Sequence, residues 1–317
     1  MKKNVKIFDE KLRDAKTVAV MAHKNPDGDA LCSVLALSRL IEKNYGIKCV
    51  CVYDGNVPDY LDNIPLRRQA HCWNKIDAST PFDIAILVDY GAEHQIGGPL
   101  DIVKNAKFVV EVDHHKNENP IADLCIDDEN ADAAAIVLYR IMREAGWRDD
   151  VDARDLMAIA ILTDTGNFKF AKNAESLSVM ADLVNGGVSI RRLIEIMNNK
   201  PRKAVLVEAR AAGNAEFFYH NRLAVATIAR HDYRNMDGRG EMVLNILGQI
   251  KGVEYIVLLK EQKENQIGIS IRSRGAAIDH IATAFGGGGH KNAAGAVVRG
   301  DTLENVRENV IKAFKGM

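Results

Sequence analysis

The sequence predicts an α/β protein in which a doubly wound parallel sheet is joined by a helical connector to a smaller α/β domain. Three observations support this prediction. The chain has 317 residues and 47% hydrophobic content, enough for two cores. Up to about residue 185, short runs rich in Val, Ile and Ala alternate with longer amphipathic stretches, as βαβ units do. After about residue 218, a new series of strands and helices begins.

The first predicted domain comprises residues 1–188. Four short apolar runs are interpreted as buried strands, at residues 18–21, 84–88, 108–112 and 159–162. A further strand is expected at 48–53, and helices at 30–43, 131–145 and 176–184. In doubly wound sheets, ligands bind outside the carboxyl ends of the strands. We therefore expect the polar residues that follow the four runs to share one site.

The rest of the chain is predicted to form a connector and a second domain. Residues 189–217 are charged and helical in pattern, and residues 218–317 form the second domain. Within that domain, strands are expected at 223–228, 255–259, 266–271 and 294–298, and helices at 241–247, 278–285 and from 303 onward. A glycine-rich turn is expected at 286–290.

Composition excludes several classes of function. The formal net charge is -1, so there is no global basic field to attract long duplex DNA. No apolar run approaches the roughly 20 residues of a membrane span and no signal peptide is evident, so we expect a cytoplasmic protein without a membrane partner. The five cysteines form no CxxC motif and are interpreted as reduced, buried residues; a thiolate metal site around Cys49 and Cys51 is the less favoured alternative.

Acids and histidines gather at the ends of the four apolar runs. They are His23, Asp27 and Asp29, then Asp89, then Asp113, His114 and His115, and finally Asp164. Each acid alone is more simply explained as a helix cap, but their joint occurrence favours a metal site. Carboxylates and imidazoles without thiolates favour Mn²⁺ or Mg²⁺ over structural zinc, and the histidines suit Mn²⁺ best. Two such ions, roughly 3.5–4 Å apart, would support hydrolysis by phosphoryl displacement.

These motifs resemble the DHH phosphoesterases (RecJ-like), in the shorter form that carries a DHHA1 domain. The four motifs of the first domain match residues 23–29, 88–89, 113–115 and 163–168, and those of the DHHA1 domain match residues 271–274 and 286–295. The resemblance spans nearly the whole chain with the motifs in order, and it is closest to the nanoRNase and pAp-phosphatase branch. Cys32 and Gln95 depart from the family pattern, where many members have glycine and arginine.

The resemblance implies a role for each candidate residue. His23 and Asp27 would hold one manganese, Asp29, His114 and Asp164 would hold the other, and Asp89 would bridge them. Mg²⁺ or Co²⁺ would be alternative ions. His115 would act on the substrate phosphate beside the catalytic Asp89, with a hydrogen-bonding role as its alternative, while Asp113 would organise the turn.

The second domain is expected to bind the substrate. The glycine-rich segment lacks the GK[ST] ending of a P-loop, so a different anion cradle is expected, with a simple tight turn as the alternative. The expected binding residues are Arg272, Ser273, Arg274, Gly287, Gly288, Gly289 and His290. The resemblance implies an active site in the interdomain cleft that hydrolyses short single-stranded RNA (nanoRNA), as an exonuclease, or 3′-phosphoadenosine 5′-phosphate (pAp), or both.

Other functions remain open from the sequence. Cyclic or linear dinucleotides, pyrophosphate and polyphosphate are alternative substrates within the same catalytic class. A non-catalytic nucleotide-binding regulator is the alternative of a different class, although the complete set of candidate ligands in this sequence argues against it. The sequence also leaves open whether the chain forms a homodimer.

Overall fold

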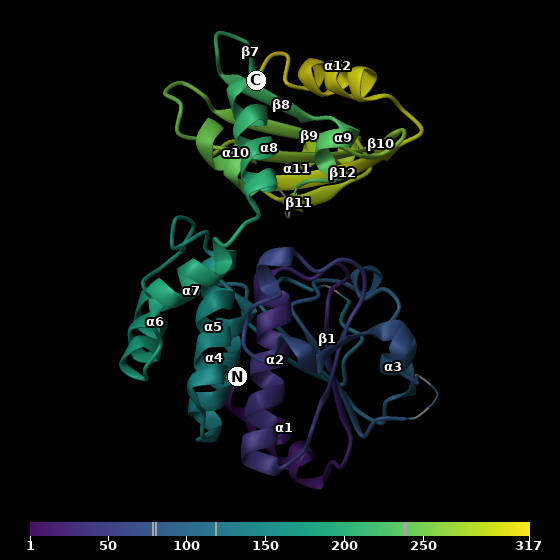
Figure 1. Ribbon diagram of the computed structural model, residues 1–317. Coiled ribbons are helices and arrows are strands. Elements are labelled where there is room, and N and C mark those ends of the chain that lie inside the picture. Colours follow the sequence, from purple (N-terminus) through teal and green to yellow (C-terminus); the bar gives the residue numbers. More distant parts are fainter. Residues whose placement is uncertain (78, 80, 118, 237–239) are drawn as a thin grey trace. The chain divides into compact units, whose positions relative to one another are not determined.

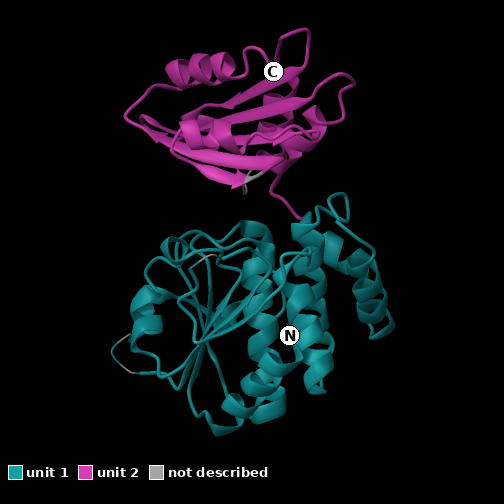
Figure 2. Cartoon of the chain, turned by 180° about the vertical axis from the view of Figure 1, so that it is seen from behind, with its two compact units in different colours: residues 1–198 teal, residues 199–317 magenta. Residues whose placement is uncertain are grey.

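A computed structural model describes residues 1–77, 79, 81–117, 119–236 and 240–317. The chain divides into two compact units, Met1–Asn198 and Asn199–Met317, which are shown in different colours in Figure 2. The segment predicted as a connector contributes helix α7 (Ile190–Met197) to unit 1 and helix α8 (Arg202–Gly213) to unit 2. Within the described ranges, no helix is long and apolar enough to cross a membrane.

Unit 1 contains a six-stranded parallel sheet with the strand order β3-β2-β1-β4-β5-β6. The strands are β1 (Val18–Ala22), β2 (Val50–Tyr53), β3 (Ala70–Cys72), β4 (Ile84–Val88), β5 (Val109–Asp113) and β6 (Leu124–Asp127). The register places Val88 opposite both Ala22 and Val112. The residues that follow β1, β4 and β5 therefore emerge together at one edge of the sheet, as the parallel arrangement predicted.

Helices cover both faces of this sheet, so the predicted doubly wound α/β fold is confirmed (Figure 1). Alternate residues of β1 point to opposite faces: Val18 and Val20 join the larger core, while Ala19 and Met21 join the other. The larger core is built with α1 (Lys2–Asp14), α2 (Gly28–Tyr45), α4 (Ala134–Ala145), α5 (Val151–Asp164) and α6 (Glu175–Asn185), and the other with α3 (Leu100–Asn105). Short 3₁₀ segments follow β2, β3 and β4, at Asp59–Leu61, Arg67–Gln69, Trp73–Lys75 and Glu93–Gln95.

The prediction that residues 159–162 form a strand is wrong, because this run belongs to helix α5. The helix begins at the N-cap Asp150, whose side chain accepts a hydrogen bond from the Ala153 backbone N–H at 3.1 Å. Every residue from Leu156 to Leu162 is buried, so the helix is apolar on all sides. A continuous apolar run does not distinguish a fully buried helix from a buried strand. Asp164 therefore stands at the end of a helix and not at the end of a strand.

Unit 2 contains a second six-stranded sheet, with the order β11-β12-β10-β9-β8-β7. Its strands are β7 (Glu216–Phe218), β8 (Leu223–Ile228), β9 (Tyr255–Lys263), β10 (Gln266–Ser273), β11 (Gly288–His290) and β12 (Ala293–Arg299). Strands β8 and β9 pair in parallel, and the other neighbouring pairs are antiparallel. One face packs against α8, α9 (Arg230–Tyr233) and α10 (Glu241–Leu247), and the other against α11 (Asp279–Ala284) and α12 (Leu303–Ala313). The predicted second, smaller α/β domain is confirmed.

The glycine-rich segment is only partly the turn that was predicted, because Gly288–His290 forms strand β11 and pairs with β12. A Cβ atom on Gly287 would lie 2.1 Å from the carbonyl oxygen of Gly295. Gly289 has a φ of 141°, and a Cβ atom there would lie 2.6 Å from the carbonyl oxygen of Ala293. Glycine is required at these two positions by the close approach of the two strands.

Candidate metal centre

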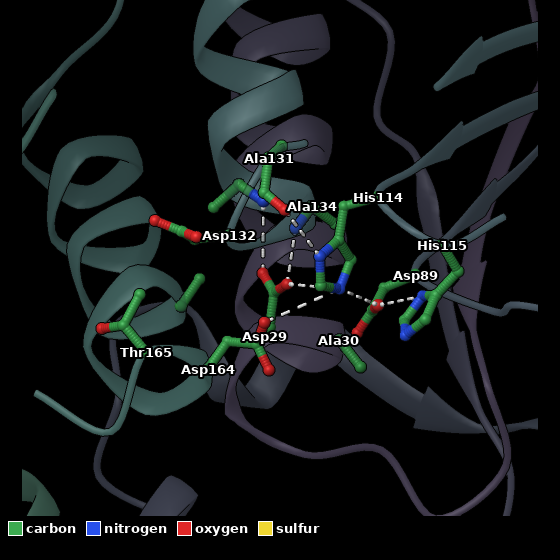
Figure 3. Close-up of polar contacts among 12 residues, drawn as sticks. Asp29, Ala30, Asp89, His114, His115, Ala131, Asp132, Ala134, Asp164 and Thr165 are labelled. Atoms are coloured by element: carbon green, nitrogen blue, oxygen red, sulfur yellow. Dashed lines mark hydrogen bonds and ion pairs between the residues drawn. The ribbon is translucent and has the colours of Figure 1, made fainter. Parts of the chain in front are cut away.

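The candidate ligands of unit 1 lie together at the carboxyl edge of the sheet, although they come from distant parts of the sequence. His23 follows β1, Asp27 and Asp29 begin α2, Asp89 follows β4, His114 follows β5 and Asp164 ends α5. Their ligand atoms form two groups, each within 4.8 Å: His23 with Asp27 and Asp89, and Asp29 with His114 and Asp164; a third such group joins Asp89 and His114 to Asp113 and His115. Figure 3 shows Asp29, Asp89, His114 and Asp164 pointing toward one another.

In the first group, His23 presents its Nε2 atom to two carboxylates. Its Nδ1 atom lies 2.9 Å from the carbonyl oxygen of Lys24, which favours a proton on Nδ1 and a lone pair on Nε2. Nε2 lies 3.9 Å from Asp27 Oδ1 and 3.9 Å from Asp89 Oδ2. Asp27 is fixed as the N-cap of α2, where its side chain accepts a hydrogen bond from the Ala30 N–H at 3.2 Å.

In the second group, His114 is held in the same manner. Its Nδ1 atom lies 3.3 Å from the carbonyl oxygen of Ala131, so that Nε2 faces the acids. Nε2 lies 3.6 Å from Asp164 Oδ2 and 4.0 Å from Asp29 Oδ2. Ligand atoms lie roughly 2.0–2.2 Å from a small divalent cation, so two atoms bound to one ion are at most about twice that distance apart. The distances from His114 Nε2 to the two acids fall within this limit.

Asp89 lies between the two groups. His114 Nε2 is 3.3 Å from its Oδ1 atom, and His23 Nε2 is 3.9 Å from its Oδ2 atom. Asp89 is 3% exposed, and among the described residues no group donates a hydrogen bond to its buried Oδ1 atom. Its φ is 53°, a left-handed conformation that is costly for a residue other than glycine. A buried carboxylate oxygen that lacks a donor is well suited to a cation, so the residues of this site fit divalent metal ions.

Asp29 is oriented by helix α4. Its Oδ2 atom accepts a hydrogen bond from the Ala134 N–H at 2.6 Å, and its Oδ1 atom accepts from the Ala135 N–H at 3.2 Å. The hydroxyl of Ser33 donates to Oδ1 at 2.8 Å. The N-cap residue of α4 is an alanine, so the Asp29 carboxylate from α2 satisfies the first N–H groups of α4 in its place.

Asp113 organises the loops around the site and is unlike a metal ligand. Its Oδ2 atom accepts from the backbone N–H groups of Tyr90 and Gly91, each at 2.9 Å. Its Oδ1 atom accepts from the backbone N–H groups of His114 at 2.7 Å and His115 at 2.9 Å, and lies 2.8 Å from His115 Nδ1. These contacts occupy the lone pairs of the carboxylate. They also orient the His115 ring, whose Nδ1 is 3.3 Å from Asp89 Oδ1.

The crowding of acids changes the proton affinity of the site. Burial, followed by the charge of Asp89, raises the pKa of Asp29 to about 7. Burial and the charge of Asp29 likewise raise the pKa of Asp164. Burial acts to lower the pKa of His114 and of His23, but neighbouring carboxylates outweigh it and raise these pKa values to about 10 and about 9. Protons and cations therefore compete for the same side chains.

Two groups that support the site were missed by sequence reasoning. Glu111, 1% exposed within β5, accepts a hydrogen bond from the Tyr90 hydroxyl at 2.6 Å and so braces the residue after Asp89. The signal in the sequence was a charged residue, Glu111, inside the apolar run at residues 108–112. Lys172 donates through Nζ to the carbonyl oxygen of Ala131 at 2.9 Å, the same oxygen that His114 contacts. No sequence pattern marks Lys172.

The predicted substrate-binding residues are brought together within unit 2. Arg272 and His290 lie opposite the same residue, Ala293, from strands on either side of it. Arg272 forms an ion pair with Glu241 at 2.7 Å. Ser273 donates to the Ala276 carbonyl oxygen at 2.5 Å, Arg274 donates to that of Gly248, and the side chain of His290 lies outside the described part of the chain.

Comparison with known proteins defines the class. The model of the DHH family N-terminal domain matches residues 17–161, and that of the DHHA1 domain matches residues 220–316. The chain therefore belongs to the DHH family of phosphoesterases, as its motifs predicted, and it is an enzyme of that family.

Within this family, the chain is similar to proteins named bifunctional oligoribonuclease and PAP phosphatase NrnA. It is 27% identical to the one from Thermus thermophilus over 94% of this chain and 89% of the relative. It is 28% identical to the one from Mycoplasma genitalium over 89% of this chain and 88% of the relative. The crystal structure of an exopolyphosphatase-related protein from Bacteroides fragilis has the same fold, with a TM-score of 0.91, 20% identity, and coverage of 99% of this chain and 97% of that one.

Proposed function

We propose that this protein is a manganese-dependent phosphoesterase that hydrolyses short oligoribonucleotides and 3′-phosphoadenosine 5′-phosphate. The observation that carries the proposal is the position of Asp89 between two groups of carboxylate and imidazole ligands. The names of the NrnA relatives support the choice of substrate.

The ligand groups divide into two cation sites. His23 and Asp27 would hold one Mn²⁺, and Asp29, His114 and Asp164 would hold the other, with Asp89 shared. Two divalent cations held by these residues would lower the pKa of a bound water and stabilise charge on the attacking and leaving oxygens of an in-line displacement. The donor set contains oxygen and nitrogen atoms and no thiolate, which favours Mn²⁺ over structural zinc.

His115 is the residue proposed to act on the substrate itself. Its Nδ1 atom lies 2.8 Å from Asp113 and 3.3 Å from Asp89, so the second ring nitrogen is the one proposed to face the phosphate. Burial acts to lower the pKa of His115, but the contacts with Asp113 and Asp89 outweigh it and raise the pKa above its usual value. A protonated imidazole there would stabilise charge on a phosphate oxygen or donate a proton to the leaving oxygen.

In unit 2, Arg272, Ser273, Arg274 and the backbone of Gly287–Gly289 are proposed to bind the end of the nucleotide that is not cleaved. The register of β10, β12 and β11 supports this proposal, because it places Arg272 and the end of the glycine-rich strand on either side of the same residue, Ala293. Arg272 would exchange its ion pair with Glu241 for a phosphate.

The test is an assay of the purified protein with Mn²⁺ and four substrates: a 5′-labelled RNA dinucleotide, 3′-phosphoadenosine 5′-phosphate, cyclic di-AMP and pyrophosphate. We expect product from the first two. Faster formation of product from cyclic di-AMP or pyrophosphate than from the first two substrates would show that the proposed substrate class is wrong. Absence of turnover on all four, in protein shown to bind Mn²⁺, would favour a non-catalytic nucleotide-binding regulator.

A further inference from the structure

The 165–172 loop, the first part of the segment between α5 and α6, is held close to the second ligand group at both ends. It begins directly after Asp164. It ends at Lys172, whose N–H donates to Asp132 Oδ1 at 2.9 Å and whose Nζ donates to the Ala131 carbonyl oxygen at 2.9 Å. That carbonyl oxygen is also 3.3 Å from His114 Nδ1, and Figure 3 shows Ala131 and Asp132 beside this group. The 165–172 loop is therefore held next to the candidate metal centre.

The conformation of this loop is strongly determined. Gly166, Asn167 and Phe168 are consecutively left-handed, with φ values of 56°, 59° and 67°. The N–H of Asn167 donates to the Leu162 carbonyl oxygen at 2.8 Å, and that of Phe168 to Thr165 Oγ1 at 2.9 Å. Left-handed residues other than glycine are costly and persist where their surroundings fix them, which is common at functional sites.

The loop presents one aromatic side chain to solvent. Phe168 packs against the core of unit 1, whereas Phe170 is 55% exposed. The Phe170 ring lies over Gly166, where a Cβ atom would be 2.9 Å from the ring carbons Cδ2 and Cε2. The N–H of Phe170 donates to the Thr165 carbonyl oxygen at 2.9 Å. Lys169 Nζ lies over the ring, 5.1 Å from its centroid, which places a positive charge on one side of the ring.

We propose that Phe170 is the surface on which a base of the nucleotide substrate stacks while the adjoining phosphate lies at the metal centre. This inference rests on the proposed function and specifies its substrate class. A single exposed apolar residue is common on a protein surface. An aromatic ring that lies over Gly166, two residues after the candidate ligand Asp164, and carries a lysine over its face suits a nucleotide. Stacking accepts every base, because each has a π face, so the site would select nucleotides over inorganic phosphates without selecting a base.

The test measures KM and kcat for Phe170→Ala with 3′-phosphoadenosine 5′-phosphate and with ribose 3,5-bisphosphate, which lacks the base. For the nucleotide, KM is expected to rise roughly 5- to 100-fold with little change in kcat, the range that follows from losing one stacked base. For ribose bisphosphate, KM is expected to stay at the wild-type value. Phe170→Trp should restore the low KM for the nucleotide.

Val151→Ala is the matched control, since Val151 is also exposed, at 46%, and lies at the start of α5, the helix that ends just before the loop of Phe170. It should leave both KM values unchanged. Equal KM values for wild type and Phe170→Ala with the nucleotide, or an equal rise with both substrates, would overturn the stacking role. Failure of the wild-type enzyme to hydrolyse the nucleotide would instead overturn the proposed function, so the two failures are distinguishable.

Discussion

The two sets of charged side chains that are proposed to act on the substrate are stabilised in opposite ways. In unit 1, acids lie beside acids, Asp89 Oδ1 is buried without a donor among the described residues, and the pKa of Asp29 is raised to about 7, first by burial and then by Asp89. In unit 2, Arg272 already has Glu241 as its partner and Arg274 donates to a backbone carbonyl. We therefore expect the first set to bind cations and the second to exchange a protein partner for the substrate. Substitutions in unit 1 should therefore affect metal binding and turnover, and those in unit 2 should affect substrate affinity.

The largest effect is expected from Asp89→Asn. The amide keeps the size of the side chain but removes the charge that both ligand groups share, so kcat should fall by more than about 10³-fold on every substrate. The measurement is steady-state turnover with saturating Mn²⁺, together with thermal unfolding to establish that the variant is folded. A folded variant with near wild-type kcat would show that Asp89 does not bind both cations needed for turnover.

A smaller loss is expected from Asp113→Asn. An asparagine cannot accept all the hydrogen bonds that Asp113 accepts from two loops and the His115 ring, so the ring would lose its fixed orientation. We expect kcat to fall about 10- to 100-fold, the usual scale for a residue that positions ligands, while KM changes little. Mn²⁺ content, measured by elemental analysis, should stay at the wild-type value. Loss of metal from this variant would make Asp113 a ligand.

The affinity for Mn²⁺ is expected to rise with pH. Nearby acids, acting against burial, raise the pKa of His23 to about 9 and of His114 to about 10. Below these values each imidazole carries a proton that a cation must displace, so affinity should increase up to about ten-fold per pH unit for each displaced proton. Calorimetric titration with Mn²⁺ between pH 6 and 8 checks the slope. A flat profile would show that the histidines bind no cation.

The smallest effect is expected in unit 2. Arg272→Gln should raise KM several-fold to about ten-fold with kcat unchanged, because one charge-assisted contact to the substrate is lost. Glu241→Gln is the matched variant: it removes the partner of Arg272 and should leave KM equal to or below the wild-type value. Equal losses of kcat in Arg272→Gln and Asp89→Asn would contradict the difference between the two sets.

Much of the fold followed from periodicity in the sequence. The strand at Leu223–Ile228 and the helix at Glu241–Leu247 have the predicted bounds, and the parallel sheet of unit 1 has the predicted character. The error at residues 159–162 arose because a helix buried on all sides has no polar face to reveal its period. The glycines before β12 looked like a turn because the sequence does not reveal that part of this segment pairs with the strand that follows it and needs their small size.

The candidate ligands could be named from the sequence because residue type restricts metal chemistry and parallel strands end at one edge. What holds them could not be predicted. Asp29 accepts a hydrogen bond from α4, more than one hundred residues away, and Lys172, which lies beyond the motif at residues 163–168, supports the carbonyl oxygen that His114 contacts. Such partners are selected by the tertiary fold, which brings backbone groups together irrespective of side-chain pattern.

Asp89 is proposed to contact both of two bound cations. Anomalous diffraction at the manganese absorption edge, from crystals grown with Mn²⁺, tests this directly. We expect two peaks, one in contact with His23 and Asp27 and the other in contact with Asp29, His114 and Asp164, both touching Asp89. A single peak, or peaks that do not contact Asp89, would contradict it.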